Sequence, residues 1–134
     1  MSTAREIRAR CHCGAVALEA TLPHGFDDIG RCTCSFCARR QAAAVTAETA
    51  SLRVTKGAEN LSVYVWGTGT AQHFFCKTCG IYTHHQRRSD PTQVGVNLGC
   101  IEGVDPWEFE PIKWTDGKNH PSDRPLPMQG SDGF

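Results

Sequence analysis

Apolar and polar residues alternate along much of the chain, which is the pattern of half-buried β-strands. In the segment 15–22, Val16, Leu18 and Ala20 fall on one face of such a strand. Other alternating segments run over 51–57, 61–67 and 92–99, and two further segments, 70–76 and 80–86, flank a Cys-x-x-Cys pair. Long helical periodicity is absent, and at most a short helical turn is expected near 46–52. The pattern predicts a mainly β fold made of small antiparallel sheets.

The residues between these segments indicate how the strands connect. The sequence KGAEN at 56–60 separates two alternating segments and looks like a hairpin turn. A Cys-x-x-Cys pair separates 70–76 from 80–86, and we expect these two strands to form a hairpin around it. Segment 42–47 is ambiguous because its alanines favour helix. Residues 114–134 are rich in Pro, Gly and Asp and predict a loop or extended tail over the domain.

Composition narrows the class of protein. The chain has 134 residues without a break in composition, so we expect a single domain over 1–134. Its 14 basic and 14 acidic residues cancel, which argues against nucleic acid or an anionic membrane surface as partner. Apolar runs are too short to span a membrane, and residues 1–10 lack the apolar core of a signal peptide. We therefore expect a cytoplasmic protein; the sequence does not indicate an oligomeric state.

Eight cysteines carry the chemical signal of the sequence. Seven of them fall into three tight clusters, namely Cys11 with Cys13, Cys32 with Cys34 and Cys37, and Cys76 with Cys79. Disulfides are rare in a reducing compartment, and clustered cysteines there more often bind metal or perform redox chemistry. The clusters therefore indicate metal binding, while Cys100 stands apart as an ordinary half-buried thiol.

The first and last clusters together match a closed zinc site. In Cys-x-Cys on an extended segment, both side chains leave the same face. In Cys-x-x-Cys-Gly the backbone can curl around one ion, and Gly80 permits the left-handed turn that this requires. Two such pairs supply four thiolates, so Cys11, Cys13, Cys76 and Cys79 predict a structural zinc that ties the first strand to the middle hairpin.

The middle cluster supplies three ligands. Cys32 and Cys34 can share a strand face, and Cys37 can return to the same ion one turn later. Catalytic zinc sites commonly keep three protein ligands and leave the fourth position open. Two other interpretations remain: Cys100 or a histidine completes a second structural site, or Cys37 is an unbound core thiol.

These motifs together resemble one known family. The sequences CHCG, CTCSFC, FFCKTCG and TDGKNHP, from Cys11 to about Pro121, are similar to the glutathione-dependent formaldehyde-activating enzymes. The resemblance implies a β-tent fold of small antiparallel sheets and a carbon–sulfur lyase that joins glutathione to formaldehyde, giving S-hydroxymethylglutathione. It also implies a structural zinc at the four-cysteine set and a catalytic zinc, possessing an open position, at Cys32, Cys34 and Cys37.

Such a reaction needs a proton donor and anchors for the carboxylates of glutathione. His84, His85 and His120 are candidates for the proton transfer, although a surface or structural role is favoured for each taken singly. On a strand His84 and His85 point to opposite faces, so at most one of them is expected to face the site. Arginine binds carboxylates bidentately, which makes Arg39, Arg40, Arg87 and Arg88 candidate anchors or, alternatively, a solvated basic edge. Trp66, Trp107 and Trp114 could wall a pocket, but core packing is the favoured role for each.

Two other classes of function compete with a lyase. One is a non-catalytic zinc module that binds protein or nucleic acid, for which arginines such as Arg8 and Arg10 could contact phosphates. The other is a carrier or sensor that binds glutathione without turnover. The charge balance and the absence of interleaved aromatic and basic residues argue against nucleic acid.

Overall fold

The computed structural model describes residues 3–67, 69–87 and 90–117. Its strands are β1 (Arg5–Arg10), β2 (Ala17–Leu22), β3 (Gly30–Cys32), β4 (Ala44–Glu48), β5 (Arg53–Lys56), β6 (Leu61–Tyr64), β7 (Gln72–Cys76), β8 (Tyr82–Gln86), β9 (Gln93–Asn97) and β10 (Lys113–Thr115). Helix α1 spans Ser35–Arg40, and short 3-10 turns span Thr49–Ser51, Ala58–Asn60, Leu98–Cys100 and Pro106–Phe109. The prediction of a mainly β fold is confirmed.

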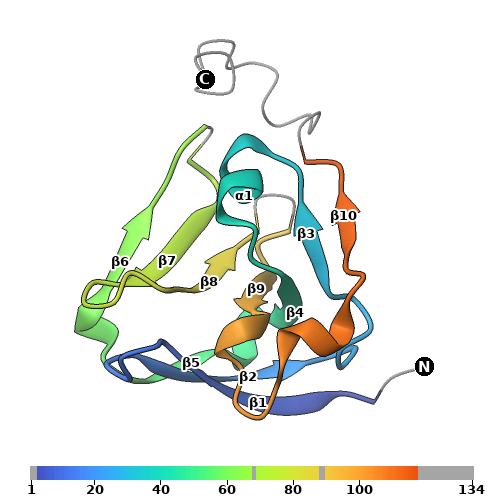
Figure 1. Ribbon diagram of the computed structural model, residues 1–134. Coiled ribbons are helices and arrows are strands. Elements are labelled where there is room, and N and C mark those ends of the chain that lie inside the picture. The colour runs from blue at the N-terminus through green and yellow to red at the C-terminus, as the bar shows by residue number, and fades with distance from the viewer. Residues whose placement is uncertain (1–2, 68, 88–89, 118–134) are drawn as a thin grey trace.

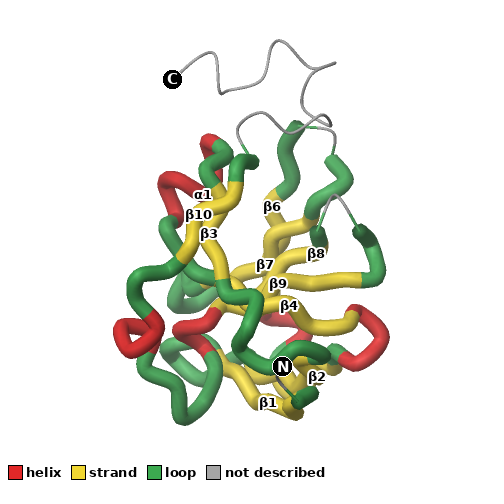
Figure 2. Tube along the Cα trace, turned by 90° about the vertical axis from the view of Figure 1, so that its right-hand side faces the viewer, coloured by secondary structure: helices red, strands yellow, loops and turns green. Residues whose placement is uncertain are grey.

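The strands form two sheets of unequal size. One has three strands in the order β1-β2-β5, and the other has seven in the order β10-β3-β4-β9-β8-β7-β6. Figure 1 shows the small sheet across the base, with the larger sheet rising from it in two diverging arms and α1 between them. Figure 2 shows the same layering from the side. All pairings are antiparallel except β3 with β10, a parallel pair that the sequence pattern does not predict.

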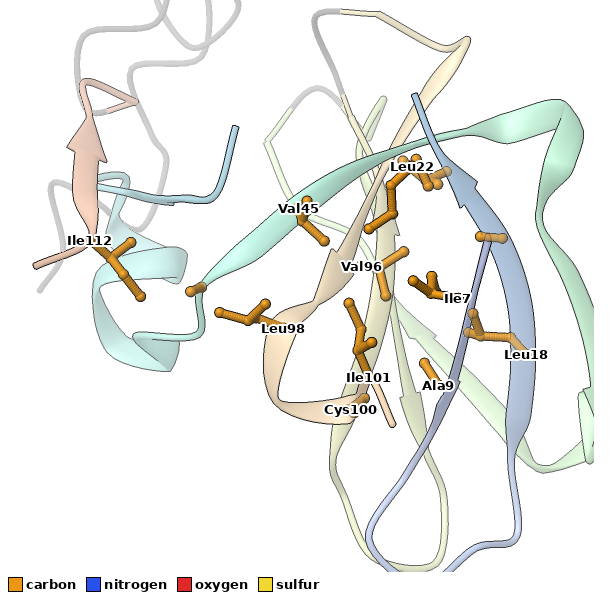
Figure 3. Close-up of a cluster of buried hydrophobic side chains, with 14 residues drawn as sticks. Ile7, Ala9, Leu18, Leu22, Val45, Val96, Leu98, Cys100, Ile101 and Ile112 are labelled. Atoms are coloured by element: carbon orange, nitrogen blue, oxygen red, sulfur yellow. The ribbon is translucent and has the colours of Figure 1, made fainter. Parts of the chain in front are cut away.

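The main core lies between the small sheet and the middle of the large sheet. Alternation on β2 turns Leu18 and Leu22 inward, where they meet Val45 of β4 and Val96 of β9 (Figure 3). These four side chains are almost completely buried. Full burial of such a side chain stabilises the fold by about 1.5–3 kcal/mol. This core joins β1 and β2 of the small sheet to β4 and β9 of the large one.

The hairpin expected around the Cys-x-x-Cys pair is present. Strands β7 and β8 are antiparallel, with His73 opposite His85 and Phe74 opposite His84. A register shift between Phe74 and Phe75 accommodates the turn toward Cys76. The register therefore places His73 and His85 side by side on one face of the sheet.

The hairpin expected at 56–60 is wrong. Strand β5 pairs with β2 in the small sheet, whereas β6 pairs with β7 in the large one. Gly57 has a φ of 75°, and the 3-10 turn Ala58–Asn60 follows it. This turn carries the chain from one sheet to the other instead of folding it back on itself.

Helix α1 and three short or charged strands, β1, β3 and β10, were not predicted. In the region expected to hold a helical turn, β4 runs to Glu48 and the 3-10 turn Thr49–Ser51 follows. Trp107 and Trp114 are 72% and 44% exposed, so the core-packing role expected for them is wrong. Among the described residues, no helix is long and apolar enough to cross a membrane.

Candidate metal centres and active site

The four-cysteine set is brought together by two loops. Cys11 and Cys13 lie in the turn after β1, Cys76 ends β7, and Cys79 lies in the tight turn before β8. Their four sulfur atoms lie within 4.8 Å of one another, and the Sγ atoms of Cys11 and Cys76 are each 3.7 Å from that of Cys13. Four sulfurs about 2.3 Å from one zinc ion in a tetrahedron would be about 3.8 Å apart. The set therefore fits a tetrahedral metal ion.

Hydrogen-bond donors around these sulfurs support thiolate ligands. The Val16 amide lies 3.3 Å from Cys11 Sγ, and the Thr78 amide and Asn60 Nδ2 each lie 3.3 Å from Cys76 Sγ. Donors of this kind stabilise the charged form of sulfur. Gly80 has a φ of 77°, the left-handed conformation that the motif predicts. The expected extended geometry of Cys11 and Cys13 is wrong, because both lie in a turn.

The three-cysteine set lies around the start of α1. Cys32 ends β3, Cys34 is the N-cap of α1, and Cys37 lies within the helix. The Cys37 amide donates to Cys34 Sγ at 3.3 Å, and the Cys34 amide lies 3.5 Å from Cys32 Sγ. The expectation that Cys32 and Cys34 share a strand face is wrong, since the strand ends at Cys32 and the helix begins at Ser35. A helix start brings the three sulfurs within 4.8 Å of one another.

No fourth histidine, cysteine or carboxylate joins this set in the part of the chain that the structure describes. Cys100 is buried elsewhere and donates to the Tyr82 carbonyl at 3.4 Å. The neighbouring thiols Cys32 and Cys34, together with burial, raise the pKa of the Cys37 thiol. Three crowded thiols cannot all ionise unless a cation compensates their charge. The donor set thus fits a metal ion with three protein ligands.

A cavity of about 330 Å³ opens beside the three-cysteine set. Its lining comes from both arms of the large sheet and from α1, and comprises Asp28, Gly30, Arg31, Cys32, Cys34, Cys37, Arg40, Ala42, Ala44, Trp66, Ala71, His73, His85, Arg87, Thr115, Asp116 and Gly117. Its volume is within the range of small-ligand sites, about 300–1,000 Å³. A Cβ built at Gly117 would collide with Cys32 Sγ, so a residue without a side chain is needed there.

Two arginines in the cavity have unused hydrogen-bonding capacity. Arg40 points Nη1 at His73 Nδ1 (3.3 Å) and Nη2 at Cys37 Sγ (3.4 Å), and Arg87 donates to Thr46 Oγ1 at 3.0 Å. The Nε atoms of Arg40 and Arg87 are buried and have no hydrogen-bond partner among the described residues. Since buried polar groups are normally satisfied, these two atoms are exceptions among the described residues.

The adjacent histidines of β8 face opposite sides of the sheet. His85 lines the cavity, its Nδ1 lying 2.6 Å from the Tyr82 hydroxyl, and its ring stacks on that of His73 at 5.2 Å. His84 is buried on the other side, where it stacks on Phe74 and contacts Thr83. Burial lowers the pKa of His84 to about 4.

The other predicted site residues lie away from the cavity or outside the described residues. Arg39 is exposed and donates to the Ser35 carbonyl at 2.8 Å, and it does not line the cavity. Arg88 and His120 lie outside the described residues.

The sequence did not point to His73 and favoured core packing for Trp66. Both line the cavity. His73 stands opposite His85 only because the register shifts by one residue between Phe74 and Phe75; an unshifted alignment on the Cys-x-x-Cys turn would have paired His73 with His84.

Comparison with known proteins agrees with these motifs. Residues 6–116 match the model of the glutathione-dependent formaldehyde-activating enzyme family. A crystal structure of a protein from Rhodobacter sphaeroides is 56% identical in sequence, with a TM-score of 0.79, and the match covers 81% of this chain and 99% of that one. The family match extends over most of the chain and includes all seven clustered cysteines. The chain belongs to the glutathione-dependent formaldehyde-activating enzyme family.

Proposed function

We propose that this protein is a cytoplasmic, zinc-dependent carbon–sulfur lyase that forms or cleaves S-hydroxymethylglutathione. The observation that carries the proposal is the difference between the two cysteine sets. Four thiols surround one position completely, whereas Cys32, Cys34 and Cys37 supply three ligands beside a cavity. A position left open next to a cavity is the arrangement of a catalytic site, and a closed four-thiol set is that of a structural one.

Each cysteine set has a separate role in this proposal. Cys11, Cys13, Cys76 and Cys79 would hold the structural zinc, and Cys32, Cys34 and Cys37 the catalytic zinc. When bound at the open set, zinc would keep an incoming thiol ionised at neutral pH, where a free thiol is mostly protonated. The chain's own residues then bind the remainder of the thiol-bearing molecule and stabilise the negative charge that develops on the aldehyde oxygen.

Arg40 and Arg87 are the proposed anchors for glutathione. The peptide carries two carboxylates, and each arginine offers a buried Nε without a partner among the described residues. A guanidinium can present Nε and a terminal nitrogen to both oxygens of one carboxylate. Arg40 lies against Cys37, so its partner would sit near the reacting sulfur, whereas Arg87 lies toward Thr46.

The proposed reaction is reversible addition of the thiolate to formaldehyde. The sulfur lone pair forms the C–S bond, the C=O π pair moves to oxygen, and the resulting alkoxide gains a proton to become the hydroxymethyl group. Cleavage reverses each of these changes. His85 is the proposed hydrogen-bond donor to this oxygen, because it lines the cavity whereas His84 is buried on the opposite side of the sheet.

Metal counting combined with an activity assay tests the proposal. Protein purified without chelator should contain about two zinc ions per chain and consume formaldehyde in a glutathione-dependent manner. Cys34→Ser should lower the zinc content to about one, abolish consumption and remain folded. Cys100→Ser is the matched control, since Cys100 belongs to neither set, and it should retain both properties.

The result of these experiments also distinguishes the lyase from a glutathione carrier and from a non-catalytic binding module. Glutathione bound at the open set without formaldehyde consumption would indicate a carrier. One zinc ion without thiol-dependent consumption would favour a non-catalytic binding module. Binding to nucleic acid would weaken steeply with added salt, whereas capture of a thiol should not.

A further inference from the structure

We propose that Tyr82 is a positioning residue that fixes the tautomer of His85, so that Nε2–H of this imidazole is presented to the substrate oxygen. The inference rests on the function proposed above, because it gives the fixed N–H group a task in that reaction. The tautomer of His85 is also a property of the resting protein, so it can be measured without turnover. Tyr82 itself does not line the cavity, and it acts through His85.

The length of the Tyr82–His85 hydrogen bond indicates which group donates. The Tyr82 hydroxyl oxygen lies 2.6 Å from His85 Nδ1. Hydrogen bonds from N–H to oxygen are typically about 2.7–3.2 Å long, and contacts below this range are typical of a hydroxyl donor, whose bonds to oxygen are about 2.5–3.0 Å long. Burial raises the pKa of Tyr82, so the phenol keeps its proton at neutral pH. The phenol therefore donates to Nδ1, and the imidazole proton is left on Nε2.

Close packing holds both rings in this arrangement. The Arg40 guanidinium carbon lies 3.7 Å from the centre of the Tyr82 ring. On the opposing strand, Gly95 pairs with His85, and a Cβ built at Gly95 would collide with Cε1 of the imidazole. A glycine at this position therefore allows the His85 ring to lie against β9. The Gly95 carbonyl, 3.4 Å from the Tyr82 hydroxyl, is a much longer contact than the one to His85.

His73 has the same tautomer for an independent reason. Its Nδ1 lies 3.3 Å from Arg40 Nη1, and a guanidinium can only donate. The proton of His73 is therefore also on Nε2. The two stacked imidazoles thus share one tautomer, with each Nδ1 accepting a hydrogen bond from the protein.

A neutral N–H donor suits the charge that develops in the proposed reaction. Burial first, and then the charge of Arg40 on α1, hold the pKa of His85 well below its usual value; Arg87 after β8 acts in the same direction, as would His73 on β7 and His84 on the same strand if they were protonated. His85 is therefore a neutral imidazole that stabilises the alkoxide by hydrogen bonding while solvent water supplies the proton. Donors fixed in advance toward a developing oxyanion lower the barrier most effectively.

Nitrogen-15 NMR of the imidazole rings tests the tautomer directly. In the resting wild-type protein, His85 should show a protonated Nε2 and an unprotonated Nδ1. Tyr82→Phe should shift the His85 signals toward a mixture of tautomers, while Tyr64→Phe, the same change at the other, half-exposed tyrosine, should leave them unchanged. A wild-type His85 protonated at Nδ1 would overturn the proposal even if the protein is an active lyase.

Steady-state kinetics test whether the tautomer of His85 affects the rate of the proposed reaction. Removal of one oxyanion donor typically lowers kcat by ~10²–10³-fold. Tyr82→Phe only misorients the N–H donor of His85, so it should lower kcat about tenfold or more. KM and the zinc content should change little. His85→Gln retains an N–H near the position of Nε2 without needing Tyr82. Adding Tyr82→Phe to His85→Gln should therefore have little further effect on kcat. Full additivity of the two losses would show that Tyr82 is merely structural and contradict the proposal.

Discussion

The neighbouring residues His84 and His85 show how surroundings assign different roles to identical side chains. Successive side chains on a strand point to opposite faces. His84 therefore enters an apolar site against Phe74, while His85 enters the cavity beside Tyr82. The sequence predicts that at most one of them serves the site, but it cannot say which, because that depends on which face of β8 the distant Cys32 region covers.

The burial of His84 has a consequence for stability. Its pKa is lowered by burial to about 4, and the unfolded chain has the ordinary value near 6.5. As the pH falls from 6.5 to 4, the unfolded state binds a proton that the folded state does not, so stability decreases in this window. At about 1.4 kcal/mol per pKa unit, the loss attributable to His84 is about 3 kcal/mol by pH 4.

Urea unfolding at several pH values compares the wild type with His84→Gln. The variant should be less stable at pH 7.5 but should lose less stability between pH 6.5 and 4. Both proteins retain all seven clustered cysteines, so acid release of metal affects both curves and cancels in the difference. Parallel curves over this window would show that His84 is protonated in the folded protein as readily as in the unfolded chain.

At the scale of the element, alternation predicted individual strands well and their partners poorly. Strands β2, β7, β8 and β9 lie where the pattern puts them, because one buried face imposes a period of two. Strand pairing depends on contacts far along the chain, so adjacent strands β5 and β6 were wrongly joined in a hairpin. The parallel contact of β10 with β3 joins segments about 80 residues apart, which local patterns do not encode.

Gly57 enables the crossing from β5 to β6. Its φ is 75°, and a Cβ there would collide with the Ala15 carbonyl oxygen. Gly103 has a similar φ of 80°, but its Cβ would meet nothing within 4 Å. Gly103→Ala should therefore cost about 1–2 kcal/mol from backbone strain alone. Gly57→Ala should cost this amount plus about 1–3 kcal/mol for displaced backbone.

Thermal or urea unfolding of the two glycine variants measures this difference. The matched pair separates steric collision from the left-handed conformation, because both positions share the latter. Equal destabilisation of the two would mean that Ala15 moves aside at no cost, and that the close approach at Gly57 does not fix the crossing.

The sequence predicts those parts of the candidate site whose residues lie close together along the chain. The two cysteine sets that the sequence suggests are also the two groups whose sulfur atoms lie within 4.8 Å of one another. The cavity takes its lining from α1, both arms of the large sheet and the segment after β10. His73 and Gly117 therefore reach it through tertiary packing, and the register shift that sets His73 opposite His85 is not visible in the sequence.

The two cysteine sets differ in how many parts of the fold they connect. The four-cysteine set joins the turn after β1, in the small sheet, to the end of β7, in the large sheet. Val16, Val54 and Leu61 pack around it as a small second core. The three-cysteine set instead spans only six positions, from the end of β3 into α1, on one arm of the large sheet (Figure 1).

This difference predicts opposite outcomes for the same substitution. Binding of a structural zinc contributes about 10–16 kcal/mol, and a domain of this kind is stable by about 5–15 kcal/mol in total. Cys79→Ser should therefore unfold much of the protein or lower its thermal midpoint drastically, because the metal link that adds to the core in joining the two sheets would be lost. Cys34→Ser should lower the midpoint only modestly, because the core of Leu18, Val45 and Val96 does not involve that set. Calorimetry with zinc analysis on both variants decides the matter: a Cys79→Ser protein that keeps two zinc ions and the wild-type midpoint would remove the structural role assigned to the four-cysteine set.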